Sequence, residues 1–130
     1  MALDKTLSYL ALARKAGLAE LGEEPACNAS NAGKAKLIVV ASDASDHTWR
    51  RAKSLVSGSN QQLVRLPYTK DELGFAIGRT SLAIAAITDA GMSASLVESL
   101  GQPELADTLQ ALKACAKQRK RTAKPTKKEH

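Results

Sequence analysis

The sequence is poor in aromatic residues: one Phe, one Trp and two Tyr make up 3% of its 130 residues. The core of this chain must therefore be built from Leu, Ile, Val and Ala. Hydrophobic residues reach 44% and charged residues 25%, which is the balance of a soluble globular protein. The length suits one domain, with enough apolar material for a core that needs no disulfide or metal.

Long apolar runs are also missing. No stretch approaches the roughly 20 residues that a helix needs to span a bilayer. The first 17 residues, MALDKTLSYLALARKAG, have the spacing of an amphipathic helix and lack the apolar segment and cleavage site of a signal peptide. We therefore expect a cytoplasmic protein that does not bind membranes.

Residues that commonly carry chemistry are scarce. Cys27 and Cys115 lie far apart, outside any C-x-x-C pair, which predicts two free thiols in a reducing compartment. His47 and His130 have no evident Ser or Cys partner, and the segment 78–81 lacks the spacing of a phosphate-binding loop. We expect no catalytic residues, no metal and no cofactor, and therefore not an enzyme.

Charge, by contrast, is distributed very unevenly. The chain has 19 basic residues (Lys and Arg) and 13 acidic residues (Asp and Glu). Residues 113–130 hold eight basic and one acidic residue, a charge of +7. Residues 1–112 hold eleven basic and twelve acidic residues, a charge of −1. A basic tail on a nearly neutral body favours salt-dependent contact with a polyanion, with little sequence specificity. We expect the tail to be a nonspecific RNA clamp. Its central residues are Lys117, Arg119, Lys120, Arg121 and Lys124.

Hydrophobic spacing predicts alternating helices and strands. Thr69 and Glu72 have the spacing of a capping box. Short apolar runs predict strands at 18–21, 37–41, 63–66 and 82–87, of which 37–41 is the clearest buried strand. Helical periodicity and turn residues predict helices at about 3–16, 25–32, 46–56, 70–78, 92–100 and 104–116.

This order predicts an α/β protein, a three-layer α-β-α sandwich around a central mixed four-stranded sheet. The turn Gly101-Gln102-Pro103 breaks the pattern. We therefore divide the chain into a folded domain, 1–101, and a C-terminal segment, 102–130, that contains a helix and a disordered basic tail.

Three polar segments are candidates for one RNA-facing end. The turn 21–24 leads into a helix with an exposed start, Lys34 and Lys36 flank the start of the strand 37–41, and residues 79–81 precede the last strand. Neighbouring loops of such a sheet can meet at one end. There, N–H groups and Lys or Arg side chains would contact phosphates.

Three motifs resemble one known family. LGEEPACNASNAGKAKLIVVASDAS, YTKDELGFAIGR and LAIAAITDAG, in that order, are similar to the large-subunit ribosomal protein 7Ae/30e family, and most to its bacterial YlxQ-like branch. The most specific pieces are 33–37 followed by Ser42 and Asp43, and 71–74 followed by Gly78. The resemblance covers about residues 7–100 and implies the same α-β-α sandwich.

The resemblance implies an RNA-binding function. Many members bind the kink-turn, a sharply bent RNA helix with a bulge beside sheared G·A pairs, which is recognised by shape and by groove and phosphate contacts. In them, the start of the second helix faces the G·A pairs and a loop before the last strand covers the bulge. The matching positions here are Gly22, Glu23, Glu24 and Asn28 at the helix, Lys34, Lys36 and Lys70 as phosphate contacts, and Arg79, Thr80, Ser81 and Leu82 in the loop.

Three positions depart from the strong binders of that family. Where those proteins often have Asn and then Glu, this chain has Glu24 and Pro25. Where many of them have a basic residue, it has Asn28. Glu24 cannot donate a hydrogen bond and Pro25 has no N–H. The loss of that basic residue removes one phosphate contact. By the rule for duplex DNA, this lowers the slope of log affinity against log salt concentration by about 0.9. We predict weak or altered kink-turn binding by the folded domain, with the tail restoring affinity at the expense of specificity.

Two functions therefore stay open. The first is a non-catalytic, monomeric RNA-binding protein, ribosomal-protein-like or ribosome-associated, that recognises structured RNA within a ribonucleoprotein. The second is a protein-interaction module on the same fold, which the acids Glu20, Glu23 and Glu24 at the expected RNA face favour. An enzyme is the third, with no nucleophile–base pattern to support it.

Overall fold

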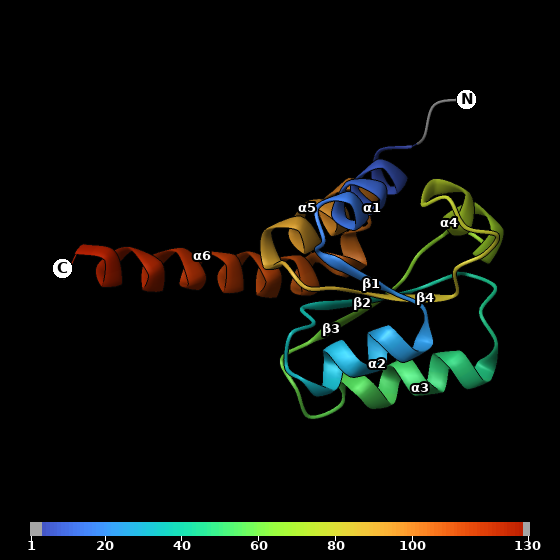
Figure 1. Ribbon diagram of the computed structural model, residues 1–130, viewed down its shortest axis with the longest axis horizontal. Coiled ribbons are helices and arrows are strands. Elements are labelled where there is room, and N and C mark those ends of the chain that lie inside the picture. Colours follow the sequence, from blue (N-terminus) through green and yellow to red (C-terminus); the bar gives the residue numbers. More distant parts are fainter. Residues whose placement is uncertain (1–3, 129–130) are drawn as a thin grey trace.

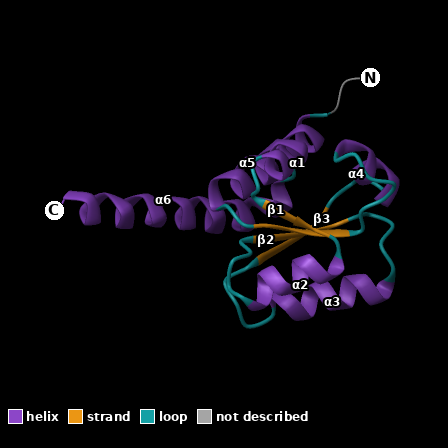
Figure 2. Ribbon diagram, in the orientation of Figure 1, coloured by secondary structure: helices purple, strands orange, loops and turns teal. Residues whose placement is uncertain are grey.

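A computed structural model describes residues 4–128 of the protein, with side chains through residue 117. Four strands form a sheet between two layers of helices (Figure 1 and Figure 2), which confirms the predicted α/β sandwich and the order of its elements. The elements are α1 (Lys5–Lys15), β1 (Ala19–Leu21), α2 (Glu23–Asn31), β2 (Leu37–Val40), α3 (Asp46–Val56), β3 (Gln62–Arg65), α4 (Lys70–Ala76), β4 (Ile84–Ile87), α5 (Ala90–Leu100), the 3-10 turn η1 (Pro103–Leu105) and α6 (Ala106–Lys128).

The sheet is mixed, as predicted, with the strand order β1-β4-β2-β3. Strand β4 pairs antiparallel with both β1 and β2, while β2 and β3 are parallel. Strands β1, β2 and β3 therefore all end at the same edge of the sheet, and α2, α3 and α4 all begin there. We call this edge the helix-start end, and the edge at which β4 finishes the opposite end.

The helices cover the two faces of the sheet unequally (Figure 2). Helices α2 and α3 lie on one face, and α1, α4, α5 and the first part of α6 lie on the other. Side chains of β2 alternate between the two cores, with Leu37 and Val39 in the larger one and Ile38 and Val40 beneath α2 and α3. No aromatic residue is among the described buried side chains, in line with the sequence prediction of an aliphatic core.

The starts of α3 and α4 are capped by their own side chains. Ser45 Oγ accepts a hydrogen bond from the Thr48 amide. At α4, Thr69 Oγ1 accepts from the Glu72 amide while Glu72 accepts from the Thr69 amide, so the predicted capping box is confirmed. These caps satisfy N–H groups that would otherwise be open to a ligand.

Helix α6 both packs on the body and extends from it (Figure 1). Leu112 is 2% exposed and belongs to the larger core, and Leu105 and Leu109 pack against it. The structure continues the helix to Lys128, where the sequence predicted disorder beyond about 116. Ala, Lys, Arg and Gln favour helix up to Lys124, whereas Pro125, which also lies in this stretch, disfavours a helix interior. The division of the chain at Gly101 stays a prediction, although the first turns of α6 contribute to the core of the body.

Candidate nucleic-acid interface

The start of α2 differs from those of α3 and α4. Its N-cap is Gly22, with a φ of 101° and no side-chain cap. The Gly22 amide donates to Ile84 O at 2.9 Å, which ties this turn to β4, and Ala26 N closes the first helical turn on Gly22 O at 3.0 Å. In the first turn, the amides of Glu23 and Glu24 have no acceptor within the helix, and Pro25 has no N–H. The helix itself therefore makes no use of these two amides.

The loop before β4 lies directly over that start. A Cβ built on Gly22 would be 3.9 Å from Arg79 Nη1 and 3.7 Å from Pro25 Cδ. The Arg79 guanidinium, a donor of fixed geometry that suits phosphate, thus stands beside the open amides of α2. The structure brings together the first and third of the segments that the sequence singled out.

This loop is held by α4 rather than being free to move. Arg79 N donates to Gly74 O at 2.8 Å, and Leu82 N donates to Lys70 O at 3.0 Å. The contact at Gly74 is so close that a Cβ there would lie 2.6 Å from Ser81 Cα and N. Glycine is therefore required at this position, and the loop is fixed relative to α4.

Lys70 lies at the same end, at the first position of α4. Its amide donates to Asp43 Oδ1 at 2.8 Å, which links the turn after β2 to the start of α4. Thr80 and Ser81 are exposed on the loop, whereas Leu82 is only 3% exposed and belongs to the larger core. The Leu82 side chain is thus an anchor for the loop and is not available at the surface. Asn28 is exposed on α2.

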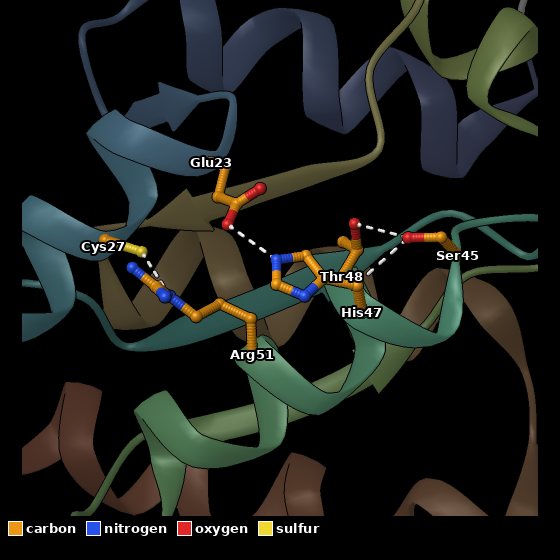
Figure 3. A network of polar contacts seen from close by, with 6 residues as sticks. All are labelled: Glu23, Cys27, Ser45, His47, Thr48 and Arg51. Carbon is orange, nitrogen blue, oxygen red and sulfur yellow. Dashed lines mark hydrogen bonds and ion pairs between the residues drawn. The ribbon is translucent and has the colours of Figure 1, made fainter.

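Polar contacts to α3 hold the first turns of α2 (Figure 3). His47 Nε2 lies 3.9 Å from Glu23 Oε2, in a pair whose side chains are 78% and 42% exposed. One turn further on, Arg51 Nε donates to Cys27 Sγ at 3.4 Å. This hydrogen bond and the charge interaction with Cys27 raise the pKa of Arg51, and Glu23 adds to the effect. The Glu23 carboxylate therefore faces α3, where His47 and Arg51 lie (Figure 3).

His47 and Arg51 were not predicted to belong to this region. Their spacing of four residues places them on one side of α3, and this spacing was the only available signal. What it could not reveal is that α2 packs on this side of α3.

The two cysteines are free thiols, as predicted, with Cys27 buried and Cys115 half-buried.

Lys34 and Lys36 lie elsewhere, so the prediction of one common end for all three segments is wrong for these two residues. Lys36 N donates to Ile87 O at the opposite end, while Gly22 N donates to Ile84 O at the helix-start end. The reason is the strand direction: β2 begins where β4 finishes. Figure 1 shows that α6 also extends on the side of the opposite end.

The expected clamp residues lie on that extended helix. Lys117 is exposed. Arg119, Lys120, Arg121 and Lys124 follow on α6, and their side chains are not among those that the structure describes.

Within residues 4–128, no helix is both long and apolar enough to cross a membrane. Among the described side chains, no three His, Cys, Asp or Glu residues gather as a metal site.

Comparison with known proteins identifies relatives of the fold. Searches found no matching family model and no matching curated protein. A solved structure of a Bacillus halodurans protein of unknown function is 28% identical with a TM-score of 0.71, over 77% of this chain and 100% of that one. The Giardia lamblia 15.5kD RNA binding protein is 20% identical with a TM-score of 0.62, over 83% of this chain and 87% of that one. The chain thus shares its α/β fold with both.

Proposed function

We propose that this protein is a non-catalytic RNA-binding protein that contacts structured RNA with its helix-start end. The observation that carries the proposal is the Arg79 guanidinium standing over the uncapped start of α2. Open amides at a helix start and a guanidinium together suit a phosphate. The likeness of fold to the Giardia RNA-binding protein supports this function.

A kink-turn is the RNA class that the family resemblance favours. The rigid link between α4 and the loop at 79–82 suits recognition by shape, because the contact surface is formed before RNA arrives. Glu24 and Pro25 at the start of α2 weaken the contact with G·A pairs, as the sequence predicts. The pairing of Glu23 with α3 reduces the repulsion that its carboxylate would exert on phosphate.

The basic part of α6 supplies affinity from the other side of the molecule. Together with Lys34 and Lys36 it gives the opposite end the features of a nonspecific clamp. In this proposal the protein is a monomer of the cytoplasm and a YlxQ-like member of the ribosomal protein 7Ae/30e family. Its RNA is then ribosomal or part of another ribonucleoprotein.

The test is a titration with three RNAs: a kink-turn, the same RNA with its G·A pairs replaced, and a plain duplex of equal length. The full chain is compared, at two salt concentrations, with a variant in which Lys117, Arg119, Lys120, Arg121 and Lys124 are changed to Gln. We expect the variant to keep a preference of about tenfold, or 1.4 kcal/mol, for the intact kink-turn, and the full chain to bind all three more tightly. Absence of affinity for every RNA at low salt would refute the proposal.

A protein-interaction module is the second candidate, because the helix-start end also carries exposed acids. Glu24, Asp43 and Asp71 are exposed there beside Lys70 and Arg79, so its charge is mixed. This function predicts a stoichiometric protein complex that survives nuclease treatment and high salt. A monomer that binds the kink-turn but retains no protein partner would exclude it.

A further inference from the structure

Phe75 is the only phenylalanine of the chain, and the fold leaves it outside the core at 69% exposed. The other large apolar side chain that is exposed among the described residues is Leu12, at 50%. Tyr9, Tyr68 and Trp49, in contrast, pack against the cores. Burial of an aromatic ring is a large stabilising contribution, and the exposed Phe75 ring remains available for a contact outside the fold.

The backbone at Phe75 is fixed relative to the candidate interface. Phe75 lies at the end of α4, just before the loop that carries Arg79. Gly78 N donates to Phe75 O at 3.3 Å, and Arg79 N donates to Gly74 O at 2.8 Å. The loop also packs so tightly on Gly74 that a Cβ there would lie 2.6 Å from Ser81 Cα and N. The end of α4 and the loop therefore form one unit. Phe75 therefore stands at the edge of the helix-start end.

The charges around this ring favour one direction of approach. Asp71 precedes Phe75 by four residues and lies on the same side of α4, which disfavours a phosphate on that side. Arg79 follows Phe75 by four residues and is exposed on the side of α2. A phosphate is thus favoured at Arg79 and disfavoured at Asp71.

We infer that Phe75 is a stacking platform for an unpaired nucleobase, next to a phosphate held by Arg79. The inference rests on the proposed function and extends it, because it gives the interface a contact that only a single-stranded or bulged nucleotide provides. A flat exposed ring suits this ligand, since any base can stack on an aromatic face.

The experiment uses the full chain and a kink-turn RNA that carries 2-aminopurine in its bulge, with a plain duplex as the second probe. The variants are Phe75→Ala, Phe75→Leu and Phe75→Tyr, and Leu12→Ala is the control for loss of an exposed apolar side chain. We expect Phe75→Ala and Phe75→Leu to bind the kink-turn about tenfold more weakly, Phe75→Tyr and Leu12→Ala to bind as the wild type does, and duplex binding to stay unchanged. The wild type should quench 2-aminopurine fluorescence, and Phe75→Leu should not.

Three results would overturn the inference, and they are distinguishable. If the wild type binds the kink-turn and Phe75→Ala binds it equally well, the proposed function stands and the stacking contact does not. If Phe75→Leu keeps full affinity while Phe75→Ala loses it, the contact needs an apolar group rather than a ring, as a protein partner would. If the wild type binds no RNA, the proposed function fails and the inference fails with it.

Discussion

The helix-start end and the opposite end of the sheet present basic groups in different settings. Arg79 is held over the start of α2 by a loop that packs on α4. Lys34 and Lys36 flank the entry to β2 at the opposite end, on the side where α6 extends. A guanidinium fixed beside open amides favours recognition of RNA shape, whereas surface lysines and a basic helix favour general attraction to phosphate. In the proposed function, the helix-start end would thus supply specificity for an RNA and the opposite end would supply affinity.

The largest effect is expected from Gly74→Ala, which disturbs only the helix-start end. The new Cβ would lie 2.6 Å from the Ser81 backbone, so the loop with Arg79 must move away from α4. We expect a loss of about 2 kcal/mol in the free energy of unfolding, measured by denaturant titration, and loss of the kink-turn preference.

Gly91→Ala is the matched control for this substitution. Gly91 lies in the first turn of α5, which begins at the opposite end, and a Cβ there would meet only Asp89 Oδ2 at 3.3 Å. Ala favours helix over Gly by about 1 kcal/mol, but the new Cβ presses on the Asp89 oxygen that accepts from the Met92 amide and caps α5. These effects oppose each other, so the stability of this variant should differ from that of the wild type by less than about 1 kcal/mol. Equal stability and equal RNA binding of Gly74→Ala would show that Gly74 does not hold the loop.

Arg79→Ala and the double variant Lys34→Ala/Lys36→Ala compare the two ends directly. Arg79→Ala should weaken kink-turn binding about tenfold, or 1.4 kcal/mol, with a smaller effect on plain duplex, because the contact depends on the geometry of the α2 start. The double variant should weaken both RNAs alike and lower the salt slope by about 0.9 for each lost contact. The separation of the two ends would be contradicted if both variants changed the two RNAs in the same way.

Tyr68, which precedes α4 at the helix-start end, gives a pH prediction. Burial and its hydrogen bond to Asp4 raise the pKa of this phenol above its ordinary value. The neutral phenol is thus favoured by the folded state. The stability that it contributes is complete below about pH 10 and is lost as the pH rises through the folded pKa.

Tyr68→Phe removes that hydrogen bond and should cost about 1 kcal/mol at neutral pH. Denaturant titrations at pH 7 and above pH 10 provide the check. The difference between variant and wild type should shrink at the higher pH. A constant difference across this range would mean that Tyr68 does not carry the alkaline loss of stability.

Much of the fold could be predicted from the sequence because its signals are local. The apolar run 37–41 predicted β2, and the spacing of Thr69 and Glu72 predicted the capping box at α4. The alternation of strands and helices then gave the sandwich. Each of these depends on residues within a few positions of one another, so no knowledge of distant contacts was needed.

The candidate site was predicted only in part because its geometry depends on distant contacts. The direction of β2 relative to β4 moves Lys34 and Lys36 to the opposite end. The packing of α2 on α3 brings His47 and Arg51 to Glu23 and Cys27. Neither feature has a signature within one segment. Leu82 likewise packs in a core that distant segments form, and its amide donates to Lys70 O.

The smallest effect concerns an acid at the helix-start end, and its sign is the sharpest test of that end as an RNA surface. Glu23→Gln removes a negative charge next to the α2 start. It also removes the weak attraction to Arg51 and the exposed contact with His47, of which the contact is worth about 0–1 kcal/mol. We expect kink-turn affinity to rise about threefold at low salt and the gain to vanish at high salt, since exposed charges are screened. Glu98→Gln is the control, because Glu98 lies on α5, where its partner at 4.0 Å is Lys113. A fall in affinity for Glu23→Gln, with Glu98→Gln unchanged, would mean that this carboxylate accepts hydrogen bonds from the RNA, and the helix-start end would then read bases through an acid instead of repelling phosphate with it.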